Sequence, residues 1–359
     1  MNNIDLDFKK KLTKVDDSLI GLDELSSLLG SEISKFCSEE LNEVIFKPIQ
    51  KFSNKSSNLF RARLVALSIS LCSDKTLVFT KQYQKEMSVR FSNLLEALHG
   101  GSLIIDDIQD GALTRRGKPS LHTEIGVPLA INSGNWLYFW ALSLIEKMEL
   151  EPRIELAVNR LCHQAMIKGH FGQALDLGVR VDELSQDRAR ELSISALKLK
   201  TGALMSLATE LGAVACGVHP EVREALKNFG LNFGYALQSF NDLGEYSLKN
   251  DQISQDLLLG RPTWIWICAG EYFSASEYLK FQKQVSVLVK AKTNVQKELM
   301  LDLKNHPLIE FSKAQAKKLM SETFDQLSSH LLKFDYELNQ RTDWKELQQL
   351  AQKVMGAYG

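Results

Sequence analysis

The 359-residue sequence has only seven prolines and no convincing stretch in which apolar and polar residues alternate. Proline interrupts helices, and alternation with period two is the pattern of a half-buried strand. Most long windows instead repeat apolar residues at intervals of three and four, as helices do. No linker rich in proline, glycine and serine divides the middle of the chain. The sequence therefore predicts an all-α protein with a single domain over residues 1–359.

The chain also lacks a charge bias, because 43 Lys and Arg residues are balanced by 44 Asp and Glu residues. This balance gives no reason to expect a nucleic acid or an anionic membrane as a partner. No uninterrupted apolar run approaches ~18 residues, so no membrane span is expected. The N-terminal stretch MNNIDLDFKKKLTK lacks the apolar core of a signal peptide. We therefore expect a cytoplasmic protein.

The few cysteines are widely separated and form no CxxC pair. They are Cys37, Cys72, Cys162, Cys216 and Cys268. Paired cysteines at short spacing are typical of zinc sites, and disulfide frameworks are typical of small secreted domains. The spacing here predicts reduced, buried thiols instead.

Two acidic triplets interrupt this apolar helical background. They are Asp106, Asp107 and Asp110, and, about 130 residues later, Asn241, Asp242 and Glu245. Both have the spacing i, i+1, i+4, and both end an apolar run. Because positions i and i+4 share a helix face, the carboxylates of the first triplet repel each other unless a cation lies between them. Hard divalent cations prefer oxygen ligands, so the triplets predict magnesium binding.

Basic residues near these triplets predict an anionic ligand that bridges the metal ions, usually a diphosphate. Arg115 and Arg116 follow the first triplet, Lys200 and Thr201 belong to the segment KLKTGAL, and Arg261 belongs to LLLGRPTW. Guanidinium groups bind phosphate oxygens in a bidentate manner. Each of these residues alone is a weak indication, and their combination carries the prediction.

The segment GGSLIIDDIQDGALTRRGKPSLH (residues 100–122) resembles the first aspartate-rich motif of the trans-isoprenyl diphosphate synthases, or polyprenyl synthetases. Four further segments follow in the order of that family: GQALDL (172–177), LKTGALMSLATELGAVACG (199–217), GYALQSFNDLGE (234–245) and DLLLGRPTW (256–264). The resemblance covers a motif-bearing core of about residues 55–265. It implies a helical bundle around one apolar cavity, with the two triplets facing each other across its mouth.

The resemblance implies a prenyltransferase that joins an allylic diphosphate to isopentenyl diphosphate through an allylic carbocation, with two or three Mg²⁺ ions, as a homodimer. The metal ligands it implies are Asp106, Asp107, Asp110, Asn241, Asp242 and Glu245. The catalytic groups it implies are Asp106, Asp107, Asp110, Arg115 and Lys200. The allylic diphosphate would be bound by Arg115, Lys200, Thr201 and Arg261, with Gln238 close by. Isopentenyl diphosphate would be bound by Arg63, His99 and Arg116, and Gln173 and Asp176 would line the site.

Two positions depart from the family pattern. Asn241 stands where the second motif usually begins with Asp, which should weaken metal binding there. Phe60 stands where the family has the lysine that binds isopentenyl diphosphate. The charge-assisted bond lost at this position is worth roughly 1.5–3 kcal/mol. These departures leave open a terpene cyclase-like enzyme, a prenyltransferase with another acceptor, or a weakly active regulatory subunit of a heteromeric synthase.

Product length can also be predicted from the residues before the first motif. In short-chain members of the family a bulky aromatic residue there forms the floor of the cavity, whereas this chain has Gly101 and Ser102. The pocket would then extend past a fifteen-carbon product. Leu98, one helical turn deeper, would be the next barrier.

Overall fold

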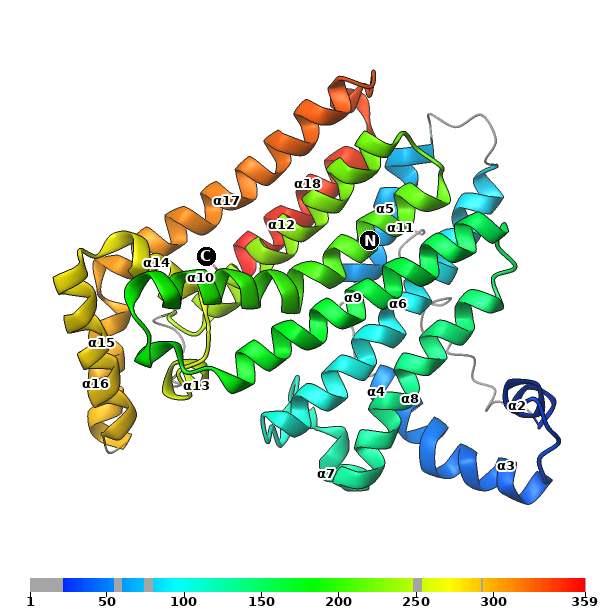
Figure 1. The fold of residues 1–359 in the computed structure, drawn as a ribbon, viewed down its shortest axis with the longest axis horizontal. Coiled ribbons are helices and arrows are strands. Elements are labelled where there is room, and N and C mark those ends of the chain that lie inside the picture. The colour runs from blue at the N-terminus through cyan, green and yellow to red at the C-terminus, as the bar shows by residue number, and fades with distance from the viewer. Residues whose placement is uncertain (1–21, 55–59, 74–79, 248–253, 292, 359) are drawn as a thin grey trace. The chain divides into compact units, whose positions relative to one another are not determined.

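The computed structural model describes residues 22–54, 60–73, 80–247, 254–291 and 293–358 (Figure 1). Apart from two-residue strands β1 (Thr114–Arg115) and β2 (Lys118–Pro119), the regular elements in these ranges are helices. The all-α prediction is therefore confirmed. Contacts divide the chain into two compact units. The first unit comprises Met1–Ala66 and Val78–Asn159, and the second comprises Leu67–Leu77 and Arg160–Gly359. The single-domain interpretation stays a prediction.

The helices follow one another with short connections. In the first unit they are α2 (Leu22–Leu29), α3 (Lys35–Leu41), η1 (Asn42–Phe46), α4 (Lys47–Asn54), α6 (Lys81–Gln109), α7 (Leu121–Ile125) and α8 (Val127–Glu146). Those with residues in both units are α5 (Phe60–Ser73) and α9 (Pro152–Gly178). In the second unit they are η2 (Val181–Glu183), α10 (Gln186–Leu197), η3 (Lys198–Gly202), α11 (Ala203–Ala215), α12 (Pro220–Gly244), α13 (Gln255–Leu258), α14 (Trp264–Tyr272), α15 (Ala275–Lys290), α16 (Thr293–Lys304), α17 (Pro307–Leu332), η4 (Leu338–Gln340) and α18 (Thr342–Tyr358).

The first unit is built on the long helix α6, which packs along α8. The hydroxyl of Thr80 accepts a hydrogen bond from the Tyr83 backbone N–H and caps the start of α6. Two glycines allow the helices to approach closely. A Cβ atom at Gly101 would lie 2.7 Å from the carbonyl oxygen of Gly134, and one at Gly134 would lie 2.9 Å from Ile105. The first triplet lies at the C-terminal end of the helix held in this contact.

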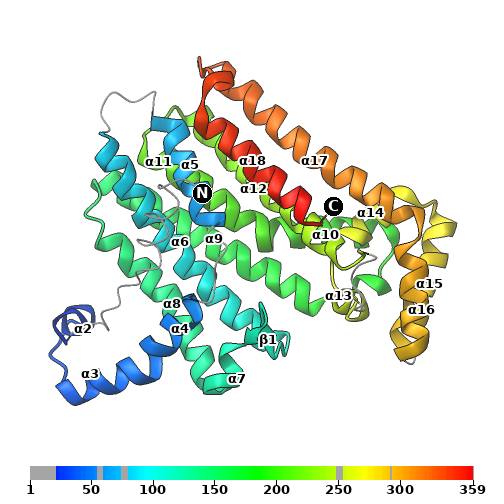
Figure 2. The ribbon, with the colours of Figure 1, turned by 180° about the vertical axis from the view of Figure 1, so that it is seen from behind.

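The second unit has α12 at its centre, with α11, α17 and α18 packed against it (Figures 1 and 2). Glycines again set the spacing between helices. A Cβ atom at Gly230 would lie 2.7 Å from the Cα of Ser206, and one at Gly234 would lie 2.8 Å from the Cα of Gly202. The first six residues of α14, from Trp264 to Ala269, are all buried. This core holds the end of α12, where the second triplet lies.

Four of the five cysteines are buried, but Cys37 is exposed, so the expectation of buried thiols is wrong at that position. Cys37 lies on the short helix α3, in which Ser38 is the one buried residue. Within the described parts of the chain, no helix is both long and apolar enough to cross a membrane.

At the start of α18, an ion pair between Arg341 and Asp343 is hydrogen-bonded to Ser70 of α5 within the second unit. The side chain of Arg341 lies 2.6 Å from that of Asp343 and donates to the carbonyl oxygen of Ser70 at 3.0 Å. The Ser70 hydroxyl donates to Asp343 at 2.9 Å. Burial raises the pKa of Asp343, but the hydrogen bonds from Arg341 and Ser70 outweigh it and hold the pKa below its usual value.

We predict that Asp343→Asn lowers the free energy of unfolding at pH 7 by about 3 kcal/mol, because it removes a largely buried carboxylate that pairs with Arg341. The pKa of Asp343 is lower in the folded protein than in the unfolded chain, so its contribution is lost as the pH falls through the folded value. The difference between wild type and variant should therefore shrink below about pH 4. Urea unfolding across pH measures it, with the exposed Asp325→Asn as control. A difference independent of pH would contradict the prediction.

Candidate functional site

The first triplet divides its three carboxylates between two environments. Asp106 and Asp110 lie one turn apart at the end of α6, where Asp110 is exposed. Asp107 is only 1% exposed, and both of its carboxylate oxygens accept hydrogen bonds from the Arg115 Nε at 2.8 Å. Arg115 also reaches Asp106 at 3.3 Å. Burial raises the pKa of Asp107, while Arg115 opposes that rise.

A hairpin brings Arg115 back to α6 (Figure 2). Gly111 and Gly117 have φ angles of 62° and 73°, which favour glycine because it has no side chain. Arg116 adopts the same left-handed region with φ 53°. The Ala112 N–H donates to the Asp107 carbonyl at 2.9 Å, which closes the turn after α6. The motif therefore folds back on itself, so that its arginine neutralises its own central aspartate.

Asp106 and Asp110 offer carboxylate oxygens, the ligands that magnesium prefers. Among the described residues, no group of three or more His, Cys, Asp or Glu side chains could hold a metal ion. Magnesium is commonly bound by one or two carboxylates together with water and substrate phosphates. Asp106 and Asp110 provide such a pair on one helix face, whereas the oxygens of Asp107 are engaged by Arg115. Metal binding at the three predicted aspartates stays a prediction.

A second group of charged side chains surrounds His99, one to two turns before the first triplet on α6. Burial lowers the pKa of His99 well below its usual value, and the positive charges of Arg61, Arg116 and Arg115 lower it further. The imidazole is therefore neutral at pH 7. Arg63, also predicted to bind the second diphosphate, lies partly buried on α5 in the same unit.

Of the residues predicted to set product length, Gly101 faces helix α8 and Ser102 is hydrogen-bonded to the α6 backbone. Gly101 lies against Gly134, so the absence of a side chain serves the helix contact. Ser102 donates to the His99 carbonyl at 2.8 Å, and Leu98 is buried. The ring of Tyr138 on α8 would lie 3.2 Å from a Cβ atom at Gly101, a neighbour that the sequence pattern did not identify. The length-setting role of Leu98, Gly101 and Ser102 stays a prediction.

In the second unit, Lys200 lies in the π-helical turn η3 and donates to Asp176 on α9 at 2.7 Å. Arg261 lies 3.8 Å from Asp176 and 3.6 Å from Asp256. Gln173 lies one turn before Asp176 on α9. The structure thus brings together three of the predicted residues, Lys200, Arg261 and Asp176. Asp256 was not among the residues predicted from the sequence, although it lies in the segment DLLLGRPTW that carries Arg261.

A hydrogen-bond chain connects the remaining residues of this unit. The Thr201 hydroxyl donates to Gln238 at 2.8 Å, and the Gln238 amide donates to Asp242 at 2.8 Å. The Trp264 backbone N–H donates to the other oxygen of Asp242 at 2.7 Å. Burial raises the pKa of Asp242 well above its usual value, against these two donors. Asp242, like Asp107, is therefore held by protein donors.

Asn241 and Glu245 lie one turn apart on either side of Asp242, which repeats the arrangement of Asp106 and Asp110. Burial and the charge of Asp256 raise the pKa of Glu245 to about 7. The two triplets belong to different units, and their predicted placement across one cavity stays a prediction.

Comparison with known proteins finds one family and several relatives. Residues 42–301 match the family model described as polyprenyl synthetase. A geranylgeranyl pyrophosphate synthase of Geoglobus acetivorans is 26% identical over 251 residues, which cover 68% of this chain and 74% of the relative. A short chain isoprenyl diphosphate synthase of Methanocaldococcus jannaschii is 30% identical over 179 residues, which cover 49% of this chain and about half (53%) of the relative. The crystal structure of a heptaprenyl diphosphate synthase from Staphylococcus aureus has the same fold, with a TM-score of 0.73, 19% identity and coverage of 100% and 99%.

Helix α9 contacts the Lys200 turn at Gly172, where no side chain fits. A Cβ atom there would lie 2.7 Å from the Leu199 carbonyl carbon and 2.8 Å from the Lys200 Cα. We predict that Gly172→Ala lowers the free energy of unfolding by about 1–3 kcal/mol, because the backbone of η3 must move. Gly169→Ala on the same helix meets no atom within 4 Å, so it should leave the protein equally or slightly more stable. Urea unfolding of both variants measures the difference, and equal stabilities would contradict the prediction.

Proposed function

Because the chain belongs to the polyprenyl synthetase family, a family of prenyltransferases, we propose that it condenses an allylic diphosphate with isopentenyl diphosphate in a magnesium-dependent reaction. The family predicted from the motifs is confirmed. The observation that carries the proposal is the pairing of cations with carboxylates in each unit, Arg115 with Asp107 and Lys200 with Asp176. Such pairs hold cations in position to meet an anionic leaving group.

The first step breaks the bond between the allylic carbon and its diphosphate oxygen. The electron pair leaves with the diphosphate, so negative charge builds up on it. Lys200 and Arg261 would bind this charge, and Asp176 fixes their positions through contacts of 2.7 and 3.8 Å. Cations that are already oriented stabilise the transition state without further reorganisation.

Magnesium, when bound, would neutralise part of the charge on the same diphosphate. The residues that would hold it are Asp106 and Asp110 in the first unit, and Asn241 and Glu245 in the second. Arg115 binds both oxygens of Asp107 and also reaches Asp106 at 3.3 Å, so the same guanidinium orients two of the three aspartates.

The second step forms a carbon–carbon bond between the allylic carbocation and the double bond of isopentenyl diphosphate. A proton then leaves the neighbouring carbon of the acceptor, and the released diphosphate would take it. Neutral His99, with Arg63 and Arg116, would bind the acceptor's own diphosphate. Apolar side chains around the reacting carbons would exclude water, which would otherwise trap the cation.

The product would be a longer polyprenyl diphosphate. Tyr138 beside Gly101 suggests a barrier supplied by α8, which α6 lacks. The named relatives differ in product, from short chain to heptaprenyl. The product length must therefore be measured.

We predict that purified protein with Mg²⁺ and an allylic diphosphate incorporates labelled isopentenyl diphosphate into longer diphosphates. Dimethylallyl, geranyl, farnesyl and geranylgeranyl diphosphate serve as alternative substrates, and mass spectrometry identifies the products. Chelation by EDTA should abolish incorporation. Asp106→Asn should lower the rate by about a hundredfold or more, because it weakens stabilisation of the leaving group. The exposed Asp302→Asn is the matched control.

Other outcomes of the same assay favour the alternatives. Diphosphate release with hydrocarbon or alcohol products and no label would indicate the cyclase-like enzyme, which Phe60 and Asn241 favour. A lack of turnover that a partner synthase restores would indicate the regulatory subunit.

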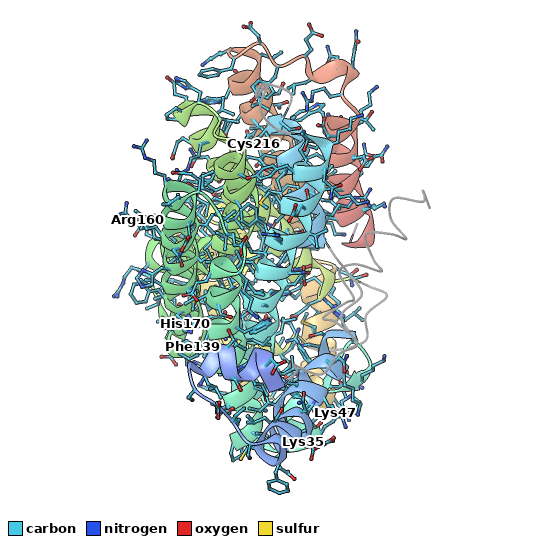
Figure 3. The ribbon with its side chains drawn as sticks, turned by 90° about the vertical axis from the view of Figure 1, so that its right-hand side faces the viewer. Lys35, Lys47, Phe139, Arg160, His170 and Cys216 are labelled. Carbon is cyan, nitrogen blue, oxygen red and sulfur yellow. The ribbon has the colours of Figure 1, made fainter. Side chains whose placement is uncertain are left out.

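A second copy of this chain is the partner that we propose for the exposed apolar residues of α8. Phe139 on α8 is 71% exposed and is labelled in Figure 3. Ile131, two turns earlier on the same helix, is 41% exposed. Exposed apolar patches commonly mark protein–protein contacts.

We predict that Phe139→Glu converts a homodimer to a monomer, because it places a charge within an apolar contact. Light scattering after gel filtration measures the mass of wild type and variant. The control Val287→Glu changes an exposed residue of α15 in the same way and should leave the mass unchanged. A monomeric wild type would contradict the homodimer.

A further inference from the structure

Helix α5 begins at Phe60, and its first turn is attached to α6. The Ser92 hydroxyl on α6 donates to the Ala62 carbonyl at 3.1 Å. One turn further along α6, the Glu96 carboxylate accepts a hydrogen bond from the Ala62 backbone N–H. The first backbone N–H groups of a helix have no partner within the helix, so Glu96 satisfies one of them. The positions of Arg61 and Glu96 are therefore fixed relative to His99.

The charges around His99 do not balance. Burial lowers the pKa of Arg61 to about 10, with Glu96 opposing the shift and the positive charge of Arg116 adding to it. Arg61 and Arg116 also act on His99, together with Arg115. Of these three guanidinium groups, Arg115 is engaged by Asp107. Glu96 is the carboxylate that interacts electrostatically with both remaining guanidinium groups, those of Arg61 and Arg116. Two positive charges therefore face one negative charge, and the region holds an excess of positive charge.

The hydrogen bonds of the group are also incomplete. The Nε of Arg61 is buried and has no hydrogen-bond partner among the residues that the structure describes. One carboxylate oxygen of Glu96 is likewise buried and has no hydrogen-bond partner among the described residues. A buried donor without a partner is costly, and a bound ligand is one way in which it can be satisfied. Arg61 is thus a buried cation with at least one donor that no described protein group uses.

Phe60 removes the lysine that would bind the acceptor's diphosphate, and Arg61 is the next residue in the chain. We propose that Arg61 supplies the cationic contact to that diphosphate in place of the missing lysine. The identity of the acceptor rests on the proposed function, whereas diphosphate recognition by Arg61 does not depend on turnover. A guanidinium group is suited to this contact because it binds phosphate oxygens in a bidentate manner.

The competing explanation is that Arg61 serves only as the counter-charge of Glu96. The structural role and the binding role predict different effects on anion binding when Arg61 or Glu96 is neutralised. If Arg61 were only structural, Arg61→Gln and Glu96→Gln would disturb the protein in the same way. If Arg61 binds diphosphate, Arg61→Gln weakens binding, whereas Glu96→Gln keeps the cation and removes a repelling carboxylate.

Isothermal titration calorimetry of the full chain tests the proposal with inorganic diphosphate and with isopentenyl diphosphate. Both are titrated in EDTA, so that magnesium-dependent binding does not contribute. We expect Arg61→Gln to weaken binding by about tenfold or more. Glu96→Gln should bind as tightly as wild type or more tightly. Arg188→Gln, at an exposed arginine of α10, is the control for loss of one positive charge and should have no effect.

A rescue variant separates lost binding from lost structure. Adding Phe60→Lys to Arg61→Gln returns a cation to the neighbouring position and should recover most of the affinity. If Arg61→Gln does not fold, as judged by circular dichroism, the Arg61→Gln/Glu96→Gln double variant leaves no unpaired buried carboxylate and is tested instead.

Binding by Arg61→Gln within twofold of wild type would overturn the proposal. So would a failure of Phe60→Lys to restore binding, or a wild type that binds neither probe. Loss of binding in Arg61→Gln together with a wild type that elongates no allylic substrate would support the role of Arg61 and reject the proposed function.

Discussion

Hydrogen bonding to a buried carboxylate, Asp242, organises the second unit. A carboxylate among apolar helices is stable only when protein donors surround it. The donors here are Gln238 on α12 and the Trp264 backbone at the start of α14, and Gln238 in turn accepts from Thr201 in η3. Three elements are therefore joined through one acid. The same bonds place the turn that carries Lys200, so the fold and the site depend on the same interactions.

The two triplets share a division of roles that their spacing explains. In each, the second residue is buried and bound by protein donors, Arg115 for Asp107 and Gln238 with Trp264 for Asp242. The first and last residues lie one turn apart on a shared face. A pair at i and i+4 suits a metal ion with water and phosphate ligands, while the residue at i+1 points to the side and fixes the helix end. This arrangement explains why neither triplet forms a complete metal site from protein ligands alone.

The departures from the family pattern acquire a physical meaning in this structure. Gly101 leaves no open space on α6, because α8 approaches at that point and Tyr138 lies beside it. Phe60 removes a cation, yet Arg61 at the next position lies among the basic groups around His99. If Arg61 binds diphosphate as proposed, it offsets the cation that is missing at Phe60. The properties of the site depend on the total charge and volume of neighbouring side chains and not on one position alone.

The sequence by itself determined the helical class and the family, and it predicted the residue types of the site. Apolar periodicity predicts helices such as α6 and α12, and the spacing of the triplets places their acids on a helix edge. The sequence pattern did not predict the hairpin of β1 and β2, because strands of two residues are too short to show alternation. Only the tertiary structure decided that Asp107 is paired with Arg115, that Gly101 contacts α8, and that Arg61 and Asp256 join the charged groups. A local pattern specifies which face of a helix a residue occupies, but the partner on that face comes from a distant part of the chain.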